Sequence, residues 1–411
     1  MGAAFGVLAV GAIGLGCDDK APPSAAGPKG SGAPVAATPA EWKVGAYLSL
    51  SGAETEFGTQ TREGIELAVD EVNAAGGIKG KPVKALYEDD KSNPQEASNK
   101  VLQLITRDKV VALLGEVASS RSKAGGIVAN KNKIPMITPS STNPEVTQVG
   151  PFVFRVCFTD DVQGKMGADF VVKTLGKKRI AILYASDVLY SSGLAKEFKD
   201  QARALGAEVV LEKSFLQTET NFTTYLNEIK AKSPDIIYSP TYYNHMVPIA
   251  RQAKAAGLKG EMFVGGDGWD AESLLNDAGD EIEGAYFTNH YAPDVPWPNS
   301  QKFVAKYRGR FKRDPSSLAA MGYDSAQVLF DAIGRAKSAD PTAIRDAIAA
   351  TKGFQGATGT ISIDANRNAD KPIVVVQIKG KKFTYHSTVG GAPAPVASAV
   401  PAVGSAAPAA K

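Results

Sequence analysis

Residues 43–87 read KVGAYLSLSGAETEFGTQTREGIELAVDEVNAAGGIKGKPVKALY and predict a strand, a helix and a second strand in turn. The stretch opens with a short apolar strand, residues 43–48, which a loop rich in Gly and Ser follows. The helix then carries apolar residues at positions i, i+3, i+4 and i+7, from Ile65 to Val72. Because Gly commonly ends helices, the pair Gly76-Gly77 predicts its C-terminal stop.

The alternation of short apolar strands and helices continues along the chain. The next helix is predicted to begin with Asn93 as its cap and Pro94 at its first position. Further strands are expected at residues 110–114, 135–138, 152–156, 179–184, 235–238 and 262–264. Apolar strands separated by helices predict parallel sheets that are covered on both faces. The fold class is therefore α/β, and these units are too many for one small sheet, so two doubly wound parallel-sheet lobes are expected.

The two lobes are expected to be joined by three crossings of the chain, with a ligand cleft between them. The N-terminal lobe would take residues 42–158 plus 291–358, and the C-terminal lobe residues 159–290 plus 359–387. The second crossing is placed near Tyr291 because an irregular stretch follows it, and the third near Gly359. A hairpin over residues 373–386, turning at Gly380, would close the C-terminal lobe.

The two ends of the chain have a different composition from the predicted lobes. Residues 1–17 resemble a bacterial lipoprotein signal, since residues 2–16 are uncharged and Gly16-Cys17 ends the run, with Cys17 as the lipidated residue. An ordinary secretory signal is the alternative, and a missing basic leader suggests a start further upstream. Residues 18–41 are expected to be a flexible tether and residues 388–411 a disordered Ala/Pro tail. Both readings of the signal predict an exported, periplasmic protein, and the first adds a lipid anchor to a membrane.

Composition excludes several functional classes. With 46 Lys and Arg against 43 Asp and Glu, the net charge of +3 argues against a nucleic-acid partner. Two cysteines exclude a disulfide scaffold or a Cys-rich zinc site, and Cys157 is expected to be a buried small hydrophobe. Three histidines leave little for metal or triad chemistry, so neither a metal nor a cofactor is predicted.

Polar residues follow the predicted strands, where ligands bind in open α/β sheets. Hydroxyl side chains dominate after the strands of the first lobe, and aromatic rings with one carboxylate dominate after those of the second. The residues concerned are Ser119, Ser140, Thr142, Tyr190, Tyr242, Asp267 and Trp269. Hydroxyls at a helix start can seat a carboxylate, and an acid beside tyrosines suits an ammonium group. Each residue alone is more often a local cap or a core residue, so only their joint placement favours a site for a zwitterion.

Three segments resemble the periplasmic leucine/isoleucine/valine-binding proteins, the receptors of branched-chain amino-acid ABC importers. They are DEVNAAGGIKG at residues 70–80, PMITPSSTNPE at residues 135–145 and RQAKAAGL at residues 251–258. The resemblance runs from about Val44 to Ile378 and implies the type I periplasmic binding fold. The family's small disulfide is absent, because neither cysteine is placed for it.

The resemblance also implies roles for individual residues. The carboxylate-binding hydroxyls fall on Ser119 and Thr142, and Ser140 would offer its backbone carbonyl to the ligand ammonium group. The acid that pairs with this ammonium group falls on Asp267, where relatives more often have Glu. Aromatic positions that line the site fall on Phe57, Tyr190 and Tyr242.

Departures from the family pattern leave the ligand side chain open. Ser191 stands where relatives usually have Gly, Arg121 lies close to the carboxylate seat, and Trp269 adds bulk near the ammonium end. The ligand would be a branched-chain or related apolar or aromatic amino acid, with an amide, urea or an aromatic acid as alternatives.

Three functional hypotheses follow. The leading one is an exported, monomeric receptor that closes its lobes over an amino acid and delivers it to the permease and ATPase subunits of an ABC importer. A ligand sensor of the same fold that signals to a regulatory partner is the alternative. An enzyme with Ser119 as nucleophile and Asp267 as acid or base is disfavoured, since only His245 falls in a strand-end cluster. The chain also lacks a G-x-S-x-G elbow, an H-E-x-x-H motif and a phosphate-binding loop.

Overall fold

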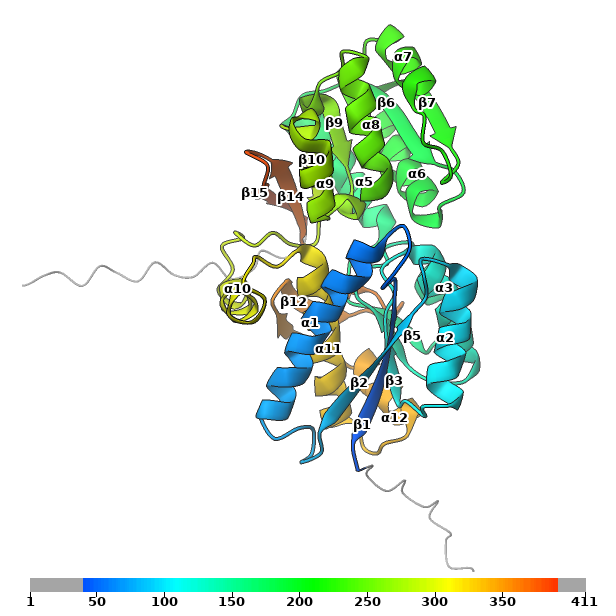
Figure 1. The fold of residues 1–411 in the computed structure, drawn as a ribbon, viewed down its shortest axis with the longest axis vertical. Helices are drawn as coiled ribbons and strands as arrows, with labels where there is room; N and C mark the ends of the chain where they lie inside the picture. The colour runs from blue at the N-terminus through cyan, green and yellow to red at the C-terminus, as the bar shows by residue number, and fades with distance from the viewer. Residues whose placement is uncertain (1–39, 391–411) are drawn as a thin grey trace, which may run out of the picture. The chain divides into compact units, whose positions relative to one another are not determined.

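The computed structural model describes residues 40–390, which form two largely parallel α/β sheets and one small antiparallel sheet (Figure 1). This confirms the predicted α/β class with two parallel sheets. None of the helices within residues 40–390 is long and apolar enough to cross a membrane. Cys17, the signal and most of both low-complexity segments lie outside the described residues.

The first sheet has the strand order β2-β1-β3-β4-β5, and every pair in it is parallel. Helices α1 and α11 cover one face, and α2 and α3 cover the other (Figure 1). The Asn93 side chain accepts the N–H groups of Gln95 and Glu96, which confirms the predicted cap of α2. The elements are β1 (Trp42–Leu48), α1 (Thr55–Ala74), β2 (Val83–Asp89), α2 (Pro94–Thr106), β3 (Ala112–Leu114), α3 (Ser119–Lys131), β4 (Met136–Thr138), α4 (Glu145–Gln148) and β5 (Val153–Arg155).

The second sheet has the order β15-β14-β10-β9-β8-β6-β7, and only β14 and β15 run antiparallel to their neighbours. The predicted closing hairpin is β14–β15, and Gly380 lies at its turn with a φ of +59°. The elements are α5 (Asp160–Asp169), β6 (Arg179–Ala185), α6 (Leu189–Ala204), β7 (Glu208–Phe215), α7 (Thr223–Ala231), β8 (Ile236–Tyr238), α8 (Tyr243–Ala255), β9 (Phe263–Gly265), α9 (Glu272–Ala278), β10 (Tyr286–Asn289), β14 (Ile373–Ile378) and β15 (Phe383–Val389).

Two strands of this sheet were not predicted, and each has a physical reason. β7 is an edge strand whose residues are mostly half-buried or exposed, so charged residues interrupt its apolar run. β10 has four residues, of which the last two, Thr288 and Asn289, are polar although buried. Neither strand has the continuous apolar run that marks a central parallel strand.

The segment between β10 and β14 adds three helices and the small sheet β11-β12-β13. Helix α11 packs closely along α1, and two glycines allow this approach. A Cβ atom on Gly64 would overlap the Ala319 carbonyl oxygen, and one on Gly322 would overlap that of Thr61. The elements are α10 (Pro298–Phe311), α11 (Ser317–Arg335), α12 (Pro341–Ala349), β11 (Phe354–Gly356), β12 (Gly359–Ile363) and β13 (Ala369–Asp370).

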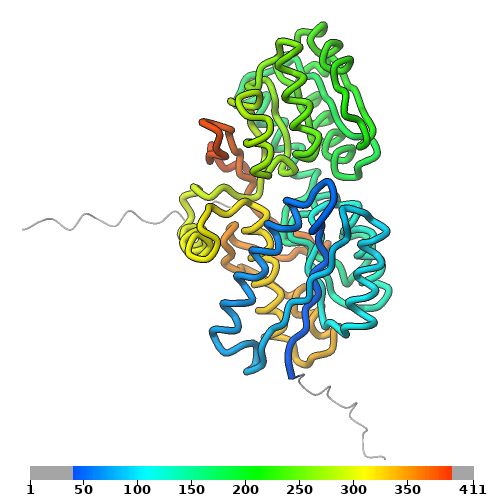
Figure 2. The backbone as a smooth tube through the Cα atoms, in the orientation of Figure 1, coloured from blue at the N-terminus to red at the C-terminus, as the bar shows by residue number. Residues whose placement is uncertain are grey.

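The chain passes from one large sheet to the other three times, after β5, after β10 and before β14, as Figure 2 lets the reader follow. Residues 359–370 pack with the first sheet, whereas we expected them in the C-terminal lobe. Ile361 and Ile363 share a buried cluster with Trp42, and the Arg155 backbone N–H donates to Arg367 O (3.0 Å). The alternating sequence of β12 predicts a strand but does not show which core the strand joins.

Candidate functional site

The predicted hydroxyl residues lie buried at the carboxyl ends of β3 and β4. Ser119 is the first residue of α3, and its Oγ accepts a hydrogen bond from the Asn143 backbone N–H (3.3 Å). Ser140 Oγ and Thr142 Oγ1 have no hydrogen-bond partner within residues 40–390. Since buried hydroxyls normally find partners, we expect a ligand to supply one, although the Thr142 hydroxyl also lies close enough to the Asp160 carboxyl group to lower its pKa.

Buried hydrogen bonds hold the two loops that carry these hydroxyls. Thr138 Oγ1 donates to Glu116 O (2.7 Å), and Ser141 Oγ donates to Val117 O (2.7 Å), which ties the loop after β4 to the loop after β3. The fully buried Arg155 donates from Nη2 to Asn143 O (2.8 Å). These side chains therefore fix the two loops that carry the predicted carboxylate-binding hydroxyls, and none of them is itself a predicted ligand contact.

Asp267, which follows β9, is oriented by two side chains from other elements. Its Oδ1 accepts from Gln163 Nε2 of α5 (2.9 Å), and its Oδ2 lies 3.1 Å from Nε2 of His290, the residue after β10. Gln163 Nε2 also donates to Thr288 Oγ1 (2.9 Å). Burial lowers the pKa of His290, so at neutral pH the imidazole is uncharged and the contact with Asp267 is a hydrogen bond rather than an ion pair.

A second acid, Asp160, lies at the start of α5 and was not predicted as a site residue. Its backbone N–H donates to Thr142 O (2.9 Å). Asp160 therefore adjoins the loop that carries the predicted hydroxyl residues. Neither of its carboxyl oxygens has a hydrogen-bond partner within the described range. Burial, with a further contribution from the Asp267 carboxylate, raises the pKa of Asp160 to about 8.

Three of the four predicted aromatic residues, Phe57, Tyr190 and Tyr242, form one contiguous cluster. The Tyr190 and Tyr242 rings are stacked, with centroids 5.1 Å apart and planes 9° apart. Phe57, from the first turn of α1, meets the Tyr242 ring edge-on at 5.4 Å. Tyr190 OH accepts the Gly268 N–H (3.1 Å), which fixes this ring against the loop of Asp267. The cluster joins residues of both sheets.

Trp269 does not lie where the sequence suggested. Its side chain is fully buried in the core of the second sheet, and Nε1 donates to Ser239 O (3.1 Å). The indole packs against Gly265, where an added Cβ atom would overlap the ring. Its only polar atom is thus used inside the protein, and Trp269 acts here as a core residue.

Gln163, Asp160 and His290 were not predicted from the sequence, and His245 was the only histidine expected in a strand-end cluster. His245 lies on α8, and its Nε2 contacts Gln217 O (2.7 Å), so its contacts are structural. His290 directly follows β10 and contacts Asp267. A correct prediction of β10 would have exposed His290 as a strand-end residue.

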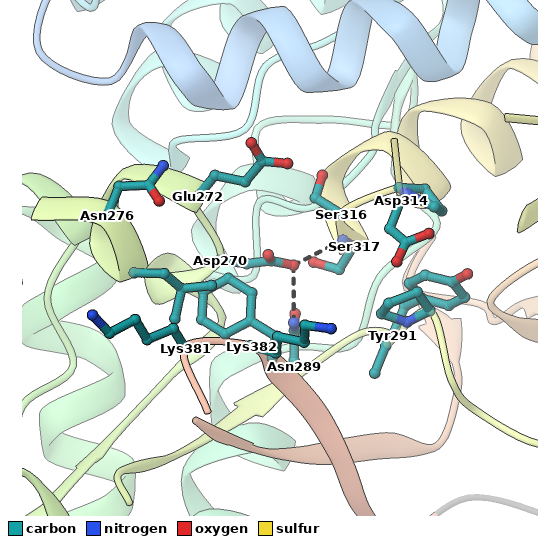
Figure 3. Close-up of a pocket in the computed structure, with 15 residues that line it drawn as sticks. Asp270, Glu272, Asn276, Asn289, Tyr291, Asp314, Ser316, Ser317, Lys381 and Lys382 are labelled. Atoms are coloured by element: carbon teal, nitrogen blue, oxygen red, sulfur yellow. Dashed lines mark hydrogen bonds between the residues drawn. The ribbon is translucent and has the colours of Figure 1, made fainter. Parts of the chain in front are cut away.

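A separate cavity of about 290 Å³ lies beside Asp270, Ser317 and Phe383, and its walls contain none of the eight predicted site residues (Figure 3). In it, Asp270 Oδ2 already accepts from Asn289 Nδ2 (2.9 Å) and from the Ser317 N–H (2.8 Å). Ser317 Oγ and Tyr291 OH in this cavity also have no partner within residues 40–390, but the strand ends hold unpartnered atoms of Ser140, Thr142 and Asp160 together, so we place the candidate site there.

Within residues 40–390, no group of three His, Cys, Asp or Glu side chains is arranged to hold a metal ion. The strand-end site therefore offers hydroxyls, carboxylates and aromatic rings, and it lies where the two parallel sheets meet through Phe57 and Tyr242. Two parallel α/β sheets with such a site at their strand ends are typical of a protein that binds a small solute.

Comparison with known proteins identifies the family. The model of the periplasmic binding protein family matches residues 41–382, and the chain belongs to this family. An amino acid binding protein of Pseudomonas aeruginosa is 32% identical over 302 residues, which cover 72% of this chain and 79% of the relative. The structure of a leucine binding protein from Thermotoga maritima has a TM-score of 0.80 and 37% identity, covering 84% of this chain and 98% of that one.

A branched-chain amino acid transporter substrate binding protein from Streptococcus pneumoniae, solved in complex with isoleucine, has a TM-score of 0.79 and 32% identity. The match covers 85% of this chain and 98% of that chain. The predicted resemblance is confirmed, and the chain is a substrate-binding protein of the ABC-transporter type and not an enzyme.

Proposed function

We propose that this protein binds a free amino acid with a branched-chain or related apolar or aromatic side chain, and delivers it to the permease of an ABC importer. One observation carries the proposal: buried hydroxyls with no internal partner follow the strands of one sheet, and buried carboxyl groups follow those of the other. This arrangement complements a zwitterion. The similarity to an amino acid binding protein and to a leucine binding protein supports the same ligand class.

In the proposed complex, Ser119 and Thr142 donate hydrogen bonds to the ligand carboxylate at the start of α3, where backbone N–H groups also favour an anion. The ammonium group donates to Asp267 and to the Ser140 carbonyl, with Asp160 within the same loop system. Phe57, Tyr190 and Tyr242 enclose the side chain. Each ligand charge then has a partner, without which its burial would be costly.

Contacts between the two sheets support closure over the ligand. Asn143 Nδ2 donates to Leu189 O (3.0 Å), and Ser273 Oγ donates to Glu56 Oε2 (2.5 Å). The lobes in this proposal are residues 42–158 with 291–370, and residues 159–290 with 371–387, which moves the last crossing to Lys371 because residues 359–370 pack with the first sheet. The three crossings would serve as the hinge.

Export as a lipoprotein is part of the proposal and rests on the residues around Cys17. Mass spectrometry of the N-terminal peptide from membrane fractions tests it. Diacylglyceryl-modified Cys17 is expected, and an unmodified N-terminus downstream of Cys17 would refute the anchor while leaving export intact.

The function itself is tested in two steps. Differential scanning fluorimetry against the twenty L-amino acids, urea, simple amides and aromatic acids should show stabilisation by at least one amino acid; at 100 times its Kd, a ligand adds about 2.7 kcal/mol. Uptake of that labelled amino acid should then fall in cells lacking the protein. Binding with unchanged uptake would point to the sensor alternative.

A further inference from the structure

A second cluster of buried charges adjoins the proposed site and is centred on Arg121. Arg121 is the third residue of α3, two residues after Ser119, and its side chain is 4% exposed. Its Nη1 donates to Glu54 Oε2 (3.0 Å), and its Nε lies 3.1 Å from Glu116 Oε2. Nη2 has no hydrogen-bond partner within residues 40–390. Burying a guanidinium N–H group without an acceptor costs free energy, so we expect a bound ligand to supply an acceptor for Nη2.

Residues around Arg121 connect it to the aromatic end of the site. Glu54 lies three residues before Phe57, and its other carboxylate oxygen accepts from Asn244 Nδ2 (3.2 Å), two residues after Tyr242. Burial raises the pKa of Tyr242, and Arg121 is the charged group that most strongly opposes this rise. Arg121 is therefore enclosed by the same segments that present Ser119, Phe57 and Tyr242.

The charges in this cluster restrict which acceptor groups Nη2 can donate to. Asp90 Oδ1 lies 3.9 Å from Arg121 Nε, and burial raises the pKa of Asp90 to about 8, so at neutral pH it is mostly protonated. Two acidic side chains, Glu54 and Glu116, already lie within ion-pair distance of the guanidinium group, at 3.0 Å and 3.1 Å. Glu116 is held in place because its Oε1 also accepts from the Ser49 N–H (3.1 Å). A further anion would be repelled, whereas a neutral oxygen would not be.

We propose that Arg121 is a specificity-determining residue of the ligand site, and that its Nη2 atom selects an amino acid whose side chain carries a neutral hydrogen-bond acceptor, such as an amide or hydroxyl oxygen. This inference rests on the amino-acid receptor of the proposed function but assigns its ligand a polar side chain in place of an apolar or aromatic one. Arg121 would bind the side chain of the ligand, whereas Ser119, Thr142 and Asp267 would bind the carboxylate and ammonium groups that all amino acids have.

Isothermal titration calorimetry with isosteric ligands tests this inference. Leucine, asparagine and aspartate have nearly the same shape but differ in polarity and charge. Valine and threonine also have nearly the same shape and differ in polarity alone. Glutamine and methionine form a further pair, in which the polar group of glutamine lies one carbon further from the backbone than in asparagine. At least one neutral polar ligand should bind about 10- to 100-fold tighter than its apolar counterpart, since one partner of the hydrogen bond is charged. Aspartate should bind more weakly than asparagine.

Two variants connect the preference to Arg121. Arg121→Lys keeps the charge but loses the planar second donor, so the ratio of polar to apolar affinity should fall towards one. The double variant Arg121→Met with Glu54→Gln removes one charge of each sign and should have the same effect without leaving Glu54 unpaired. Arg107→Lys, at an exposed ion pair with Glu88, is the matched control and should leave the ratio unchanged.

The outcomes separate this inference from the proposed function. Tighter binding of leucine, valine and methionine than of all their polar counterparts would overturn the role of Arg121 while leaving an amino-acid receptor in place. Binding of no amino acid at all would overturn both. The wild-type ligand series decides the question even if a variant does not fold.

Discussion

Replacing Asp267 with Asn removes one charge from the centre of the proposed ammonium site and changes its shape very little. Asp267 is 6% exposed and accepts from Gln163 on one oxygen and from His290 on the other. In the Asn variant, Oδ1 can still accept from Gln163, and His290, whose pKa burial lowers, can shift its proton so that Nε2 accepts from the new amide. The unliganded fold should therefore tolerate the change.

The cost should appear in binding. Removing one partner of a buried charge pair costs about 2–5 kcal/mol, or roughly 30-fold to several thousand-fold in Kd. Asp160 can substitute only in part, because burial, the largest cause of its raised pKa, persists in the variant even though the contribution of the Asp267 carboxylate is lost. Calorimetry at pH 7 with the tightest-binding amino acid measures the loss, and urea unfolding without ligand checks the fold.

The matched control is Asp277→Asn, an exposed acid on α9, which should bind as the wild type does. If Asp267→Asn retained its affinity within threefold while its unfolding free energy stayed normal, the assignment of Asp267 to the ammonium group would be wrong.

Three further predictions concern closure, pH and chemistry. Glu56→Gln should weaken amino-acid binding about fivefold in calorimetry, because Glu56 accepts from the Ser273 N–H and hydroxyl across the two sheets; an unchanged Kd would argue against a role in closure. Burial raises the pKa of Asp160 to about 8, so this group makes the ligand-free fold lose stability as the pH rises from about 4 to 8. Asp160→Asn should therefore flatten the fall in unfolding temperature over this interval, and an identical slope would refute the assignment. Cys157 is buried, and burial raises its pKa to about 12. Iodoacetamide should therefore modify Cys157 only after unfolding, as measured by mass spectrometry. Rapid labelling of the native protein would contradict this burial.

The sequence was sufficient for the architecture because the central strands carry uninterrupted apolar runs. It also predicted the loops after β3, β4 and β9 as site loops. Ligands bind at the carboxyl ends of parallel strands, and the residues at such an end follow directly from the predicted strand. Ser119, Thr142 and Asp267 were predicted in this way, and all three are buried after strand ends, while their role in binding stays a prediction.

The parts that could not be predicted depend on partners distant in the chain. Gln163 reaches Asp267 across 104 residues, and nothing in its local sequence marks it as a site residue. Trp269 follows a strand, as site residues do, but sequence position does not show whether a side chain turns to the cleft or into the core. His290 was missed because β10 is short and partly polar.

The central claim is that both charged ends of an amino acid are held by buried groups of this protein. Calorimetry compares the tightest-binding L-amino acid with two analogues, one lacking the α-amino group and one with an amidated carboxylate. We predict one-to-one binding of the amino acid and at least roughly 30-fold weaker binding of each analogue, as expected for a lost buried charge pair. Equal affinity for either analogue, or tight binding of urea or an aromatic acid when no amino acid binds, would contradict the account.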